Sequence, residues 1–198
     1  MSFAFGCAIV FLPALGFSLL GERQKAAAPL PVLGLVDDFA LVDQSSAPVA
    51  RTAFDGAPWI ASFVFTRCGT VCPRLTERLR AIQGLSRRDD RGLRLVTFSV
   101  DPEHDGPSVL QAYAEGHGAD AQRWTFLTGS EGAIRAVAKS FAVALDGEAD
   151  PTQPDFGIMH TGHLVLVDAS SRIRGYYPSS EEGVENRIFD DLKRIGAS

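Results

Sequence analysis

The chain has 198 residues, which is enough for one compact domain and a short appendage. Its hydrophobic content of 45% and charged content of 22% are typical of a globular protein with a core. The net charge of −5 at pH 7 argues against a nucleic-acid-binding protein, which usually carries an excess of basic residues, and no glycine-rich phosphate loop is present.

The first predicted element is an uncharged apolar segment, FAFGCAIVFLPALGFSLL, at residues 3–20. About 18 apolar residues are the shortest run that spans a bilayer, whereas the core of a signal peptide is shorter and follows basic residues. No lysine or arginine precedes this run, and no clear cleavage site follows it. We therefore expect residues 1–28 to form a membrane anchor and linker. A cleaved signal peptide and a buried helix are the alternatives.

The next elements lead to a pair of cysteines. Two short apolar runs around the turn-forming QSSAP predict a β-hairpin within residues 37–54. The strongly apolar WIASFVF, residues 59–65, predicts a central strand that is covered on both faces. Apolar residues then recur at helical spacing from Pro73 to Gly84, and proline suits the first turn of a helix.

The rest of residues 29–198 alternates between strands and helices and is predicted to complete one domain. The expected elements are a strand at 93–100, a helix at 108–118, a strand at 124–129, a helix at 130–145, two strands at 163–177 and a helix at 181–195. Such alternation predicts a mixed sheet with helices on both faces. With a cysteine motif between the first core strand and its helix, the predicted class is α/β: a thioredoxin-like fold with an N-terminal β-hairpin extension.

The cysteine motif, FTRCGTVCPRLTERL at residues 65–79, is the strongest chemical signal in the chain. Cys68 lies in the loop before the predicted helix and Cys72 at its start. The partial positive charge of a helix N-terminus favours thiolates, so we expect both sulfurs to ionise near neutral pH. One helical turn between them brings the sulfurs to the same side, where they can close a disulfide or bind a metal. The alternative to a redox or metal site is that the two cysteines form a structural disulfide or remain as inert thiols.

Thiolates select soft or borderline ions such as Cu(I) and Zn(II), and two sulfurs usually need a further ligand. The chain has four histidines. His117 is expected at the surface or at a helix C-terminus, and His104 in a loop near the cysteine edge of the sheet. His160 and His163 precede an apolar strand, and because side chains three apart on an extended chain point to opposite faces, only one of them is expected to reach the metal.

The cysteine segment, together with SVDPEHDGP, WTFLTG and HTGHLVLVDASSRIRGYY, resembles the Sco/SenC family from about residue 31 to residue 195. That resemblance implies a membrane-anchored, thioredoxin-like copper-binding protein that assists assembly of the copper centre of cytochrome c oxidase. It matches Cys68 and Cys72 to the cysteines of the family and His160 to its histidine. It also matches Asp101 to the acidic residue of the DPE turn.

The site that this resemblance implies holds copper between Cys68, Cys72 and His160. Cu(I) would be trigonal, and Cu(II) would add a fourth ligand, either water or Asp101. The polar loop at residues 146–157 would carry the histidine to the thiolates. The same cysteines would form a redox-active pair able to reduce the disulfide of a partner by thiol–disulfide exchange.

The expected protein is a copper chaperone rather than an enzyme. Its expected partners are the copper-bearing subunit of cytochrome c oxidase or another copper chaperone, and no nucleic acid. The domain is expected in the periplasm, held to the inner membrane by a single N-terminal helix. Three features depart from the family pattern: Gly69 stands where many members have proline, His104 lies within the DPExD segment, and no basic residue precedes the anchor.

Two other classes remain open on the residues alone. A thiol–disulfide oxidoreductase or a peroxiredoxin-like thiol peroxidase would also place a thiolate before Pro73, although peroxidases have threonine at the position of Gly69. A structural zinc domain would need His163 or an acidic side chain to complete four ligands.

Overall fold

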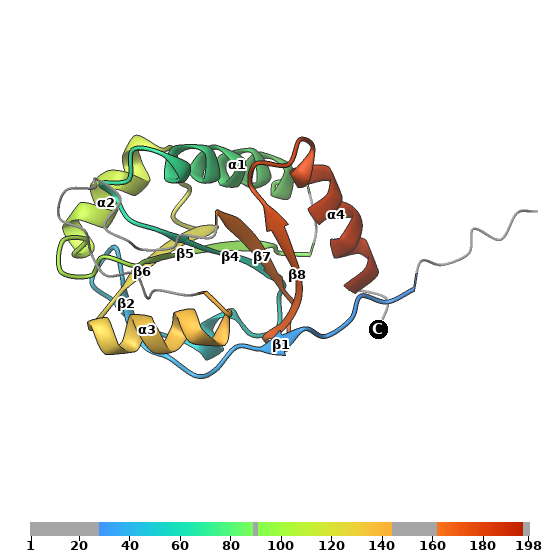
Figure 1. The fold of residues 1–198 in the computed structure, drawn as a ribbon, viewed down its shortest axis with the longest axis horizontal. Coiled ribbons are helices and arrows are strands. Elements are labelled where there is room, and N and C mark those ends of the chain that lie inside the picture. The colour runs from blue at the N-terminus through green and yellow to red at the C-terminus, as the bar shows by residue number, and fades with distance from the viewer. Residues whose placement is uncertain (1–27, 89–90, 144–161, 196–198) are drawn as a thin grey trace, which may run out of the picture.

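An eight-stranded mixed sheet forms the centre of the computed structural model, which describes residues 28–88, 91–143 and 162–195 (Figure 1). The strand order is β1-β8-β7-β4-β5-β6-β2-β3. The strands are β1 Gly34–Leu35, β2 Ala40–Asp43, β3 Pro48–Ala50, β4 Trp59–Val64, β5 Arg94–Ser99, β6 Trp124–Thr128, β7 His163–Val167 and β8 Arg172–Pro178. β4, β5 and β6 are parallel, and every other neighbouring pair is antiparallel.

Helices cover both faces of this sheet, as the alternating pattern predicts. They are a 3₁₀ turn at Arg51–Phe54 and the α-helices α1 Val71–Ser86, α2 Pro107–Gly116, α3 Glu131–Ser140 and α4 Val184–Ile195. α1 and α4 lie on one face and α3 on the other (Figure 1). α2 lies beside α1, and the hydroxyl of Tyr113 in α2 is 2.8 Å from the hydroxyl of Thr76 in α1. The arrangement confirms the predicted mixed sheet.

The central strand β4 explains why the core is continuous across the sheet. All six of its residues are buried, as the unbroken apolar run predicts for a strand that is covered on both faces. Aromatic rings pack on the α3 side: Phe63 stacks on Phe98 with centroids 5.1 Å apart, and Phe141 meets Phe63 edge-on at 5.4 Å. A rigid β4 fixes the position at which the chain leaves it, and that is where the cysteine motif begins.

The predicted hairpin is confirmed and forms one edge of the sheet. β2 pairs with β3, and Val42 continues the sheet by pairing with Thr128 of β6. The turn is closed by the Asp43 carboxylate, which accepts hydrogen bonds from two backbone N–H groups of the turn. The other edge was not predicted: β1 is only two residues long, too short to leave an alternating pattern.

The helix expected at residues 130–145 is shorter than predicted. α3 ends at Ser140, and Ala142 adopts a left-handed conformation with φ of 53°. The N–H groups of Ala142 and Val143 donate to the carbonyls of Lys139 and Ala138, the two bonds that define a Schellman C-cap. Glycine usually marks such an end, so an alanine there gave no sequence signal.

The predicted membrane anchor falls on residues 1–27, which lie outside the described part of the chain. Within the ranges that the structure does describe, no helix is both long and apolar enough to cross a membrane. The anchor therefore stays a prediction.

Candidate functional site

The two cysteines lie where β4 passes into α1, with Cys68 in the connecting loop and Cys72 in the first turn of the helix. Pro73 follows in that same turn, as predicted. The Cys68 N–H donates to the Phe65 carbonyl at 3.1 Å, which folds the loop back towards the strand. The Cys72 N–H in turn donates to the Cys68 sulfur at 3.4 Å. The sulfur thus takes the place of a capping oxygen at the start of the helix.

The environments of the two thiols are unequal. Burial pushes the pKa of Cys68 upwards, but hydrogen bonds from the side chain and backbone of Cys72 and from Thr70 outweigh it and hold that pKa below its usual value. Burial raises the pKa of Cys72 to about 12, and its hydrogen bond with Cys68 and the nearby charge of Asp105 add to the rise. The expectation that both sulfurs ionise near neutral pH is therefore wrong for Cys72, whereas the lowered pKa of Cys68 favours its thiolate.

Both thiols are also more buried than a loop position suggests. The exposed fraction is 8% for Cys68 and 1% for Cys72, and both are free rather than joined in a disulfide. Gly69 between them has negative φ and open space where a Cβ would project. Neither the backbone nor its surroundings therefore require glycine at this position. Compared with a proline there, Gly69 leaves the backbone between the cysteines less restrained.

A buried carboxylate that the sequence reasoning missed holds the loop in place. Asp105 is fully buried and accepts hydrogen bonds from the Thr66 N–H at 2.9 Å and the Thr66 hydroxyl at 2.5 Å. It also accepts one from the Ser99 hydroxyl at 2.6 Å. These bonds tie Thr66, two residues before Cys68, to the end of β5. The signal was the second aspartate of the DPEHDGP segment, of which only the first aspartate was singled out.

That first acid, Asp101, lies at the rim of the site. Its carboxylate pairs with the Arg67 guanidinium at 2.6 Å, and Arg67 immediately precedes Cys68. As a metal ligand it would first have to leave this ion pair. Its carboxylate is therefore a weaker candidate for a fourth Cu(II) ligand than the sequence suggested.

The predicted metal-binding histidine, His160, lies outside the described residues, and the chain resumes at Gly162. Gly162 sits against the start of α1: a Cβ added there would lie 2.9 Å from Cγ1 of Val71, the neighbour of Cys72. Its carbonyl accepts a hydrogen bond from the Ser179 N–H at 2.8 Å, so this position is fixed. Gly162, two residues after His160, thus lies beside the first turn of α1, which carries Cys72.

The other histidines have separate positions. His163 begins β7, is half-buried, and pairs in register with Pro178. His104 is exposed in the turn after β5. His117 caps the C-terminus of α2 and packs on Tyr113 with ring centroids 4.3 Å apart, which confirms the expected capping position. Among the described residues no three side chains of His, Cys, Asp or Glu come together as a metal site.

Comparison with known proteins assigns the same regions to one family. The profile of the SCO1/SenC family matches residues 30–196. A SCO1 protein homologue of Bacillus subtilis (strain 168) is 31% identical over 189 residues, which cover 94% of this chain and 90% of the homologue. The match spans both the cysteine motif and the strand that follows His160.

Solved structures agree in fold. A SCO1/SenC family lipoprotein from Bacillus anthracis (strain Ames) is 28% identical, with a TM-score of 0.75 over 86% of this chain and 99% of that one. BsSco, described with a disulfide switch and as a member of the Sco family of cytochrome c oxidase assembly proteins, is 25% identical, with a TM-score of 0.72 over 86% and 99% of the two chains. Copper-bound ScoI of Bradyrhizobium japonicum is 26% identical, with a TM-score of 0.64 over 81% and 99%. The predicted thioredoxin-like fold is confirmed.

Proposed function

Since the chain belongs to the SCO1/SenC family, we propose that it is a copper-binding protein that takes part in the assembly of cytochrome c oxidase. One observation carries the proposal: Cys68, whose pKa is lowered, and the buried Cys72 lie at the start of α1, and Gly162, two residues after His160, packs against the same turn. The copper-bound relative and the oxidase assembly proteins named above support the assignment.

The proposed ligands are Cys68, Cys72 and His160, with copper as cargo. A residue two positions before Gly162 lies within about 7 Å of it along the chain, close enough for an imidazole to approach Val71 and the sulfurs. Two thiolates and one imidazole are a donor set suited to Cu(I). Because the pKa of Cys72 is about 12 when no metal is bound, copper must displace its proton, so binding releases protons and weakens at low pH.

The ligand set is tested by His160→Ala in the reduced full chain. We expect a copper affinity at least tenfold lower, because His160 is a proposed direct ligand and the loss of even a ligand's hydrogen-bond partner commonly costs that much. His104→Ala is the matched control, since His104 is an exposed histidine at the same end of the sheet. His163→Ala separates the two neighbouring histidines. Equal copper affinity of the His160→Ala variant and the wild-type chain would remove His160 from the proposed site.

The role in oxidase assembly is tested in cells that lack the chromosomal copy. We expect the wild-type chain to restore cytochrome c oxidase activity and the variant lacking both cysteines to fail. Restoration by the double cysteine variant would contradict the proposed role. If a variant restores the oxidase activity only in part, and copper salts added to the medium restore it fully, this would further support delivery of copper.

A thiol-redox activity is the second candidate, and the unequal thiols favour it. Cys68, which has the lowered pKa and the larger exposed fraction of the two, would attack a disulfide sulfur of the partner as a thiolate, forming a mixed disulfide while the partner sulfur leaves as a thiolate. Cys72 would then attack Cys68, which releases the second partner thiol and leaves a Cys68–Cys72 disulfide. Stoichiometric reduction of an oxidised acceptor, measured without copper, tests this; absence of any mixed disulfide in the Cys72→Ser variant would exclude it.

For location, we propose that the chain is held at the membrane by residues 3–20 with the described domain on the periplasmic side. The lipoprotein relative supports attachment to a membrane, and the uncharged length of the segment supports a spanning helix. Fractionation followed by alkaline extraction tests the anchor: the full chain should stay with the membranes, and release by alkali would contradict it.

A further inference from the structure

A cavity of about 350 Å³ opens at the end of the sheet opposite the cysteines. Pro58 and Arg91 in its wall precede β4 and β5, whereas the cysteines follow β4, so the two sites lie at opposite ends of the same parallel strands. Asp168 and Arg172, which flank the β7–β8 turn, form another wall. The cavity therefore has no part in the copper site described above.

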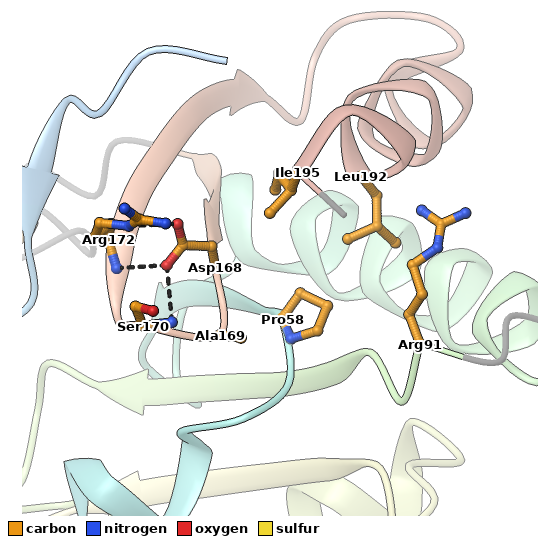
Figure 2. A pocket seen from close by; sticks show the side chains of 8 residues that line it. All are labelled: Pro58, Arg91, Asp168, Ala169, Ser170, Arg172, Leu192 and Ile195. Atoms are coloured by element: carbon orange, nitrogen blue, oxygen red, sulfur yellow. Dashed lines mark hydrogen bonds and ion pairs between the residues drawn. The ribbon is translucent and has the colours of Figure 1, made fainter. Parts of the chain in front are cut away.

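Two arginines, Arg91 and Arg172, and one carboxylate, Asp168, line the polar side of the cavity, and its other side is apolar. The Asp168 carboxylate accepts from Arg172 Nε at 2.8 Å and from Arg174 Nη1 at 2.7 Å, so two guanidinium groups surround one carboxylate. Arg91 and Arg172 lie on opposite sides of the opening, with Pro58 between them (Figure 2). Leu192 and Ile195 of α4 close the apolar side. Such a site suits an anion attached to an apolar group.

Exposed apolar side chains continue from the rim of this cavity. Leu35 of β1 pairs in register with Arg172 of β8. Val32, Leu33 and Leu35 are each more than half exposed, and with Leu85 they are the exposed large apolar side chains of the described residues. Arginines beside exposed leucine and valine form the pattern of surfaces that rest at the boundary between lipid headgroups and acyl chains.

The chain enters the fold at this same end. Arg194 of α4 donates to the Ala28 carbonyl at 2.7 Å, and Arg174 donates to the Pro31 carbonyl at 3.1 Å. Ala28 is only eight residues after Leu20, the last residue of the apolar segment, and an extended chain of that length spans at most about 30 Å. If residues 3–20 span the membrane, this end of the domain must stay close to the bilayer surface.

We propose that the cavity binds the phosphate group of an anionic phospholipid, with Arg91 and Arg172 as its cationic ligands and Val32, Leu33 and Leu35 in the headgroup layer. The proposal rests on the proposed membrane anchor and adds an orientation to it. The cavity end faces the lipid, and the cysteine end of β4 points away from it towards partner proteins.

The test uses the reduced full chain in nanodiscs of phosphatidylcholine alone or with added phosphatidylglycerol. Hydrogen–deuterium exchange is followed at residues 31–35 and 168–172. Each basic residue near an anionic surface contributes about a fivefold effect, so we expect exchange about 25-fold slower in the anionic discs and loss of that difference in Arg91→Gln/Arg172→Gln. Arg91→Gln alone leaves the Asp168 contacts in place and should lose part of the protection. Arg135→Gln, an exposed arginine of α3, is the matched control.

Each other result overturns the proposal. Equal exchange in neutral and anionic discs, or protection that survives the double substitution, means that no lipid phosphate binds there. Equal protection by inorganic phosphate in neutral discs means that the site takes free phosphate and not lipid. Copper binding by the same samples is measured in parallel, so a failure of this proposal is distinguished from a failure of the proposed function.

Discussion

At the scale of single residues, the site depends on two thiols that differ in burial and in hydrogen bonding. Cys68 receives hydrogen bonds, whereas Cys72 is shielded and gives up its proton only at high pH. The sequence predicted the pair and its position at a helix start. It could not predict the asymmetry, because that depends on which sulfur caps the helix and on Asp105, which folds in from the turn after β5.

The asymmetry predicts selective alkylation. In the reduced, copper-free chain, iodoacetamide should label Cys68 more than about tenfold faster than Cys72 near neutral pH, because the thiolate is the nucleophile. Cys68 is also the more exposed of the two. Peptide mapping by mass spectrometry gives both rates. In strong denaturant the two rates should converge, and equal rates in the folded chain would contradict the assignment.

The buried Asp105 makes a second prediction at this scale. Asp105→Asn keeps the shape but replaces an acceptor oxygen by a donor that faces the Thr66 and Ser99 groups. We expect the free energy of unfolding to fall by about 1–3 kcal/mol, the usual cost of an unsatisfied buried partner. Asp101→Asn, which loses only a partly exposed ion pair, should change it by less than about 1 kcal/mol. Urea denaturation measures both, and equal losses would show that Asp105 does not hold the loop.

At the scale of elements, the site forms where two elements distant in sequence meet. β4 delivers the cysteines to α1, and the start of β7 returns beside Val71. Apolar runs and helical spacing were sufficient to predict β4, β5, β7 and α1. The two-residue β1 and the early end of α3 were missed, since an edge pairing and an alanine C-cap depend on tertiary contacts.

Substitution of Gly162 tests the packing of the start of β7 against α1. It has φ of 56° and no room for a Cβ beside Val71. Gly162→Ala should therefore lower the free energy of unfolding by about 1–3 kcal/mol, through left-handed strain and overpacking together, and it should weaken copper binding by displacing the segment that carries His160.

Gly118→Ala is the matched control for that substitution. Gly118 has a similar φ of 66°, but nothing lies within 4 Å of its added Cβ. It should show the backbone strain alone, with unchanged copper affinity. If both variants bind copper equally well, the packing of Gly162 against α1 has no part in the site.

At the scale of the whole molecule, the two ends of the sheet have different tasks in this account. The carboxyl ends of the parallel strands carry the thiols, and the opposite end carries the entry of the chain, the arginine-lined cavity and the exposed residues of β1. The sequence indicated the family and the proposed ligands. It did not indicate this polarity, because Leu35 meets Arg172 only through the pairing of β1 with β8, and Arg91 and Arg172 line one cavity only in the folded chain.

The ion pairs at the cavity end predict how the fold responds to acid. Burial raises the pKa of Asp168, but hydrogen bonds from Arg174, Arg172 and Ser170 outweigh it and hold the pKa below its usual value. Since the folded-state pKa is then lower than the unfolded one, this carboxylate stabilises the fold above about pH 4, and the contribution is lost as pH falls through the folded pKa.

Asp168→Asn measures that contribution. We expect the variant to be less stable than the wild-type chain by about 3 kcal/mol at neutral pH and the two stabilities to converge in acid. Urea denaturation over a series of pH values gives the difference. If the difference in the free energy of unfolding between the two proteins stays constant down to acid pH, the charge of the carboxylate is not what stabilises this turn.

Copper stoichiometry tests the central claim most directly. The reduced full chain is titrated with Cu(I) under a competing chelator, and bound copper is counted for the wild-type chain and for Cys68→Ser/Cys72→Ser. The account predicts one tightly held copper per wild-type chain and none in the double variant, with an unchanged fold by circular dichroism. Equal copper in the two proteins would contradict it.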